Sequence, residues 1–110
     1  MSDGEFEIKV QQLMDALRAY RPERAYLFGS WAHGEGDDLS DLDVVIIKHT
    51  AAPFFHRLWE FARLLPAGTG GVDILVYTPE EFEEMRREGN AFVDMVVEEG
   101  RLIYAGSAEG

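Results

Sequence analysis

The sequence predicts a small α/β domain in which helices cover a sheet. Its 110 residues are 46% apolar, which suits one core and fits one domain spanning residues 1–110. Two apolar runs, residues 43–47 (DVVII) and 72–77 (VDILVY), have the composition of buried strands. Segments with helical spacing of apolar residues alternate with these runs. Such alternation is typical of a sheet packed against helices.

The first element is predicted to be an amphipathic helix. Apolar residues recur at helical spacing from Phe6 to Leu17, and either Ser2 or Asp3 can cap the start of the helix. Pro22 cannot continue a helix, so the helix must end before it.

A strand and a loop are expected next. Residues 24–28 (RAYLF) are aromatic and aliphatic, and this strand should end at Gly29. Ser30 can cap a short helical turn, and residues 34–40 (GEGDDLS) have the composition of an exposed loop. The run at residues 43–47 is then expected to form the central strand.

A helix with a wide apolar face follows Pro53. It is expected over residues 54–65, where apolar residues recur at helical spacing. We expect Trp59 and the phenylalanines around it to lie in the core. Pro66 and the glycines that follow it should end the helix before the strand at residues 72–77.

Two more helices and a strand are predicted in the last third of the chain. Residues 78–81 (TPEE) combine an N-cap threonine, a proline at the first helical position and a capping-box acid, and they predict a helix that ends near Arg87. Asn90 can cap a further helix that stops at Gly100. Residues 101–104 (RLIY) predict a final short strand.

Composition excludes several classes of protein. Asp and Glu number 21 against 10 Lys and Arg, and the net charge of −11 disfavours stable nucleic-acid binding and favours cations and basic protein surfaces. The absence of cysteine excludes disulfides, thiolate nucleophiles and thiolate metal sites. No apolar run is long enough to span a bilayer and the N-terminus is acidic, so we expect a cytoplasmic protein without membrane contact.

Three aspartates are the candidate metal ligands. Asp41 and Asp43 stand two residues apart at the start of a strand, so their carboxylates can point to the same side. Mg²⁺ takes a few such oxygen ligands and completes its shell with water and phosphate. Asp73 lies within an apolar strand, where an ionised carboxylate is costly unless it is paired or metal-bound. If its strand neighbours that of Asp43, it becomes the third ligand.

A phosphate site is predicted at the end of the first strand. Gly29 allows the backbone to approach a polyphosphate closely. Ser30 offers a hydroxyl at the start of a helical turn, where backbone N–H groups face an anion.

Each of these features also has an ordinary structural interpretation. Gly29 and Ser30 can form a simple turn with a helix cap, and residues 40–43 can be a solvated start to a strand. Asp73 can lie at a sheet edge or pair with Arg63. The acidic loop does not fit a calcium-binding EF-hand, and the three histidines, His33, His49 and His56, lack the spacing of a zinc site.

The order and spacing of these motifs resemble the DNA polymerase β-like nucleotidyltransferase superfamily. Residues 29–34 (GSWAHG), 40–45 (SDLDVV) and 72–75 (VDIL) carry the resemblance, which covers nearly the whole chain. Within the superfamily the chain is similar to the minimal nucleotidyltransferases, the antitoxin partners of HEPN-domain toxins. One position departs from the family pattern: His33 stands where the family usually has arginine, so one phosphate contact changes from a permanent cation to a group that is largely neutral at pH 7.

The resemblance implies a fold, a reaction and a partner. The fold is a small mixed sheet with the acids on one face and helices on the other. The reaction is Mg²⁺-dependent transfer of a nucleoside monophosphate, most simply AMP from ATP, to a hydroxyl of a HEPN toxin. Asp41, Asp43 and Asp73 would be the catalytic, metal-binding acids, and the nucleotide would contact Gly29, Ser30, His33 and Ser40.

Two alternatives stay open. The chain can be an antitoxin that masks its partner by contact alone, or a transferase for small molecules, although 110 residues leave little room for an acceptor pocket. Residues 79–99 carry eight acids and two arginines, which is typical of a solvated helical face and can also steer a basic partner. The acids are Glu80, Glu81, Glu83, Glu84, Glu88, Asp94, Glu98 and Glu99.

Overall fold

A computed structural model describes residues 2–28, 42–66 and 72–106, and the side chains of residues 2–6 are not described. The elements follow the chain in the order α1 (Ser2–Tyr20), β1 (Arg24–Phe28), β2 (Leu42–Ile47), α2 (Phe54–Ala62), β3 (Val72–Tyr77), α3 (Pro79–Arg87), α4 (Ala91–Glu99) and β4 (Arg101–Ala105). Every helix and strand expected in these ranges is present, and three differ at one end. β2 begins one residue earlier than expected, α2 ends three residues sooner, and β4 extends one residue further.

The four strands form one mixed sheet in the order β3-β2-β1-β4. β2 and β3 are parallel and are connected through α2, whereas β1 pairs antiparallel with both β2 and β4. β2 is central and four of its residues, Val44–Ile47, are fully buried, as its continuous apolar sequence predicts. The mixed sheet that the family resemblance implied is confirmed.

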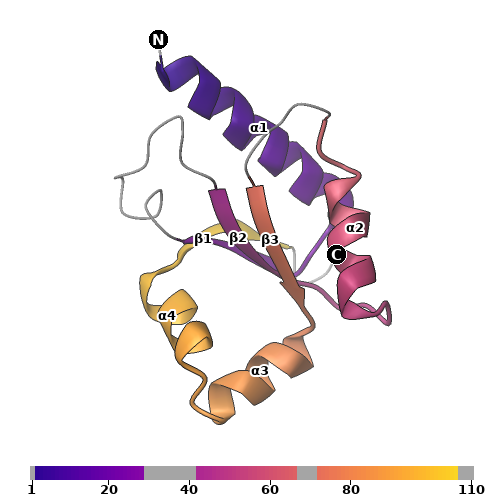
Figure 1. Ribbon diagram of the computed structural model, residues 1–110, viewed down its shortest axis with the longest axis vertical. Coiled ribbons are helices and arrows are strands. Elements are labelled where there is room, and N and C mark those ends of the chain that lie inside the picture. Colours follow the sequence, from indigo (N-terminus) through magenta and orange to yellow (C-terminus); the bar gives the residue numbers. More distant parts are fainter. Residues whose placement is uncertain (1, 29–41, 67–71, 107–110) are drawn as a thin grey trace.

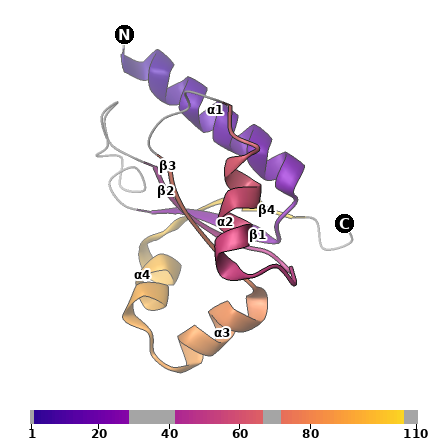
Figure 2. The same cartoon turned by 45° about the vertical axis from the view of Figure 1, so that its right-hand side comes forward.

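Helices cover both faces of the sheet, which differs from the expected arrangement of acids on one face and helices on the other. One core joins alternate β2 residues, such as Val44 and Ile46, to Leu17 of α1 and Phe61 of α2. The residues between them pack instead against α3 and α4, as the second group of buried side chains shows: Val45, Ile47, Phe82, Val93 and Val96. In Figures 1 and 2, α1 and α2 lie on one side of the strands and α3 and α4 on the other.

Local signals explain where the helices begin and end. α1 stops at Tyr20 because Arg21 takes a left-handed conformation with φ 59° and Pro22 follows. At α3 the capping box is complete, because the Glu81 N–H donates to the Thr78 hydroxyl and the Thr78 N–H donates to the Glu81 carboxylate. Asn90 caps α4 by accepting bonds from two backbone N–H groups, as the sequence predicts.

The expectation that Trp59 lies in the core is wrong. Its side chain is 62% exposed and that of Phe55 is 81% exposed, whereas Phe61 is fully buried. α2 is a single helix lying on a narrow sheet, so only one side of its wide apolar face can be covered. The histidines next to these elements, His49 and His56, are exposed beside carboxylates, which fits their expected place at the surface. No helix within the described residues is long and apolar enough to cross a membrane.

Candidate active site

Asp43 and Asp73 lie next to each other in the sheet. Each is the second residue of its strand, and they are partners in the parallel pairing of β2 with β3. Neighbouring strands are about 4.8 Å apart, and partners in register point to the same face. Figure 1 shows the two strands running side by side in the same direction. A metal site shared by these two acids requires that their strands be neighbours. Asp43 and Asp73 meet this requirement.

The two carboxylates lie where the apolar packing of the sheet ends. Asp43 and Asp73 lie on the same face of the sheet as Val45 and Ile47, which are buried under α3 and α4. The two acids are nearer the beginning of their strands. Asp43 is half-buried and Asp73 is exposed. Asp73 therefore lies on an edge strand in contact with solvent, so the sequence-based expectation of a costly buried charge does not apply. It forms no ion pair with Arg63, whose guanidinium lies 5.1 Å from the centre of the Trp59 ring.

Aromatic residues border the acid pair on the β1 side. Phe28, the last residue of β1, is the antiparallel partner of Asp43. Its ring packs edge-to-face against Phe92 of α4, with 5.6 Å between the ring centres. Both belong to the same core as Val45, so Phe28 and Phe92 form an apolar wall beside the carboxylates. This wall was not predicted from the sequence, although the position of Phe28 directly before Gly29 was a signal.

The other predicted site residues lie outside the described residues: Gly29, Ser30, His33, Ser40 and Asp41. The described structure stops at Phe28 and resumes at Leu42, and Phe28 lies directly opposite Asp43. The undescribed segment thus begins and ends at the sheet edge that carries the acid pair. This topology agrees with a common site, and the contacts of those five residues stay predictions.

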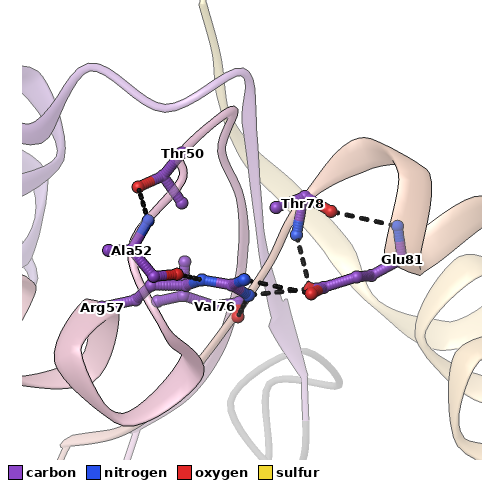
Figure 3. A network of polar contacts seen from close by, with 6 residues as sticks. All are labelled: Thr50, Ala52, Arg57, Val76, Thr78 and Glu81. Carbon is purple, nitrogen blue, oxygen red and sulfur yellow. Dashed lines mark hydrogen bonds and ion pairs between the residues drawn. The ribbon is translucent and has the colours of Figure 1, made fainter.

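A charged clamp joins α2 to the far end of β3. Arg57 is buried, with 6% of its surface exposed, and donates from its two terminal nitrogens to the two carboxylate oxygens of Glu81 at 2.7 and 3.0 Å. Its Nε donates to the Ala52 carbonyl at 2.8 Å and its Nη1 to the Val76 carbonyl at 3.2 Å. Figure 3 shows these bonds meeting the α3 capping box at Glu81. The capping box was predicted from the sequence, but the role of Arg57 was not, because Arg57 is distant from it along the chain.

This ion pair shifts the pKa of both partners. The hydrogen bond from Arg57, aided by those from Thr78, holds the pKa of Glu81 below its usual value despite partial burial. The hydrogen bond to Glu81 likewise raises the pKa of Arg57. The clamp lies at the end of β3 opposite Asp73, so its role is to fix α2 and α3 on the sheet.

A family model described as "Polymerase beta, Nucleotidyltransferase" matches residues 11–109, nearly the whole chain. The chain belongs to this nucleotidyltransferase family. No curated protein matches the sequence of this nucleotidyltransferase.

Solved structures share the fold of this nucleotidyltransferase. A protein of Sulfolobus solfataricus described as a nucleotidyltransferase has 22% identity and a TM-score of 0.56, with 92% of this chain and 86% of that chain covered. A toxin–antitoxin structure with AMP-PNP has 22% identity and a TM-score of 0.59, with 90% and 74% covered. A mutant form of the toxin–antitoxin MntA-HpeT has 19% identity, a TM-score of 0.56 and the same coverage.

The carboxylates of this nucleotidyltransferase supply part of a binding site for a divalent cation. Asp43 and Asp73 supply hard oxygen donors from adjacent strands, which are the donors that Mg²⁺ prefers. Within residues 2–28, 42–66 and 72–106 no group of three candidate ligands comes together. Asp41, the third acid expected, lies outside this part of the chain. Two of the three predicted ligands are thus adjacent.

Proposed function

We propose that this nucleotidyltransferase transfers AMP from ATP to a hydroxyl of a partner protein, a HEPN-type toxin, and so acts as its antitoxin. The observation that carries the proposal is the in-register pair of Asp43 and Asp73 at one sheet edge. Family membership supplies the reaction class. The toxin–antitoxin structures that share the fold support the kind of partner, and the AMP-PNP in one of them supports an adenine nucleotide.

The site has to bring a negatively charged nucleotide together with a hydroxyl of the partner protein. The acceptor oxygen bonds to the α-phosphorus of ATP while the bond to pyrophosphate breaks, and the hydroxyl proton is released. Asp41, Asp43 and Asp73 would hold Mg²⁺, which would neutralise charge on the phosphates and lower the pKa of the attacking hydroxyl. Asp43 and Asp73 act from fixed strands, so their carboxylates are positioned before the nucleotide binds.

The remaining predicted residues act on the nucleotide. Gly29 and Ser30 would bind the β- and γ-phosphates and keep the leaving group in line with the attack. His33 would add a phosphate contact, and Ser40 lies in the motif that contains Asp41 and Asp43. One of the toxin–antitoxin structures carries glutamate at two aspartates with the same spacing as Asp41 and Asp43.

The acidic helices are expected to steer the partner. All the acids on α3 and α4 except Glu81 are exposed, and Glu81 is bound to Arg57. Such a surface attracts basic proteins and loses its effect as salt screens it. The complex is therefore expected to form more slowly as the salt concentration rises.

The test is co-expression with the product of the adjacent gene, followed by size exclusion and intact-mass spectrometry with and without ATP and Mg²⁺. We expect a complex whose partner gains one adenylate with the wild-type chain but not with Asp43→Asn. A complex without added mass would identify an antitoxin that masks its partner by contact. No complex and no labelled protein in a lysate given labelled ATP would point to a small-molecule acceptor.

A further inference from the structure

α2 carries an exposed row of side chains that nothing in the described structure covers. We call this row the α2 stripe: Phe55, Trp59, Ala62 and Arg63. Phe55, Trp59 and Ala62 follow one another at three or four residues, and the C-cap Arg63 lies four residues after Trp59, so all four share one side of the helix. Phe55 and Trp59 are among the most exposed large apolar side chains described, at 81% and 62%. Contiguous exposed apolar surface of this kind typically marks a protein interaction site.

The stripe is held in place before any partner binds. The Phe55 ring packs edge-to-face on Phe54, whose ring is 5.8 Å from that of Tyr77. The Trp59 ring lies under the Arg63 guanidinium. The opposite side of α2, which contains Phe61, is packed into the core, so the stripe is not needed to complete the fold.

The stripe also lies in the least acidic part of the chain. Glu60 is the single acid between Asp43 and Asp73, a segment that contains Lys48, Arg57 and Arg63. Arg57 is bound by Glu81, whereas no carboxylate of the described residues lies within ion-pair distance of Arg63. A surface that complements the stripe is therefore apolar, with a carboxylate facing Arg63.

This charge pattern favours binding of another protein over pairing with a second copy of the chain. Two copies paired through the stripe would join two chains of net charge −11, and the stripe contains no carboxylate to face Arg63 of the other copy. An amphipathic helix of another protein, with carboxylates beside its apolar side, meets both requirements of the stripe.

The stripe and the acid pair lie on opposite sides of the sheet, so a partner helix on the stripe does not cover the acid pair. α2 follows β2 and precedes β3 in the chain, and its packed side joins the core that contains Val44 and Ile46. We propose that the α2 stripe is the docking surface for an amphipathic helix of the acceptor protein that carries carboxylates beside its apolar side. This inference rests on the proposed function, because it takes the toxin partner as the occupant.

Trp59 itself can report docking. The chain has two tryptophans, so Trp31→Phe leaves Trp59 as the single indole. This variant is mixed with the purified product of the adjacent gene, and Trp59 emission and the dissociation constant are measured by fluorescence and calorimetry. We expect a blue shift on binding, because the exposed indole becomes buried. Phe55→Ala and Arg63→Glu should each raise the dissociation constant at least tenfold.

Matched controls alter similar surface elsewhere. Ile8→Ala removes another exposed apolar side chain, on α1, and Arg18→Glu makes the same charge change as Arg63→Glu at an exposed position. Both should change the dissociation constant less than twofold. The substituted residues are exposed, so thermal unfolding of all four variants is expected to match the wild type.

The outcomes separate this inference from the proposed function. Transfer of adenylate with no shift of Trp59, and with Phe55→Ala and Arg63→Glu binding normally, overturns the stripe alone. Binding that depends on the stripe but yields no adenylate supports the stripe and contradicts the transfer. No complex at all overturns both. A blue shift that grows with the concentration of the chain alone would assign the stripe to a second copy and also overturn the inference.

Discussion

Asp43 and Asp73 occupy matching positions on neighbouring parallel strands, one half-buried and the other exposed at the sheet edge. Two carboxylates so placed repel each other, and a divalent cation between them removes the repulsion. If the pair binds Mg²⁺ as we propose, metal binding will stabilise the folded protein.

Replacing one acid should abolish the metal response. Asp43→Asn or Asp73→Asn removes one of the three carboxylates proposed to hold the cation, so binding of Mg²⁺-ATP should fall below detection in isothermal titration calorimetry. Without metal, the melting temperature of Asp73→Asn should equal or exceed that of the wild type, because repulsion is relieved. Asp94→Asn, at an exposed acid of α4, is the control and should bind normally. Unchanged Mg²⁺-ATP affinity in both site variants would rule out the site.

The histidine in place of the family's arginine should make the activity depend on pH. His33 contributes a positive charge only when protonated, so nucleotide affinity should rise as the pH falls from 8 toward about 6, near the ordinary histidine pKa. His33→Arg should flatten this dependence because arginine stays charged. Identical pH profiles for the two proteins would show that the side chain does not contact the nucleotide.

The clamp between Arg57 and Glu81 should stabilise the fold. Glu81→Gln leaves the buried guanidinium without a charged partner, and we expect a loss of about 1–2 kcal/mol in the free energy of unfolding, a range that allows for the partial exposure of Glu81. Glu80→Gln, at the neighbouring exposed acid, should cost less than about 0.5 kcal/mol. Urea unfolding measures both.

The clamp also predicts a dependence of stability on pH. The pKa of Glu81 is lowered in the folded protein, so its contribution is complete above the unfolded value of about 4.3 and is lost as the pH falls through the lower folded value. The stability difference between the wild type and Glu81→Gln should thus shrink below about pH 4. If the stability difference between the two proteins stayed constant down to about pH 2, the ionised Glu81 carboxylate would not be the source of the stabilisation.

Removal of one buried hydroxyl is expected to leave the stability unchanged or to raise it, in contrast to the loss expected for Glu81→Gln. The Tyr20 hydroxyl is buried and finds no hydrogen-bond partner among the described residues, and burial raises its pKa. Tyr20→Phe should therefore leave stability unchanged or raise it by up to about 1 kcal/mol. Tyr26→Phe removes a hydroxyl that accepts a bond from Arg24 at 2.9 Å and should cost about 1 kcal/mol. Destabilisation of both variants to the same extent would show that Tyr20 has a partner.

Much of the fold could be predicted because its signals are local. The limits of α3 follow from a threonine, a proline and a glutamate within four residues, and β3 spans the apolar run read from the sequence. The aspartates were found in the same way, from their position beside or within apolar runs. Their roles in a nucleotide site came from the resemblance to a family rather than from any contact.

Tertiary structure decided the relationships between distant residues. That Asp43 and Asp73 are partners depends on the parallel pairing of β2 with β3, and the bond between Arg57 and Glu81 joins residues 24 positions apart. The apolar pattern of α2 could not show which side the sheet would cover, so Trp59 was placed in the core although it is exposed. Periodicity determines which residues share a helix side or a strand face, whereas burial and pairing depend on which surfaces meet when the chain packs.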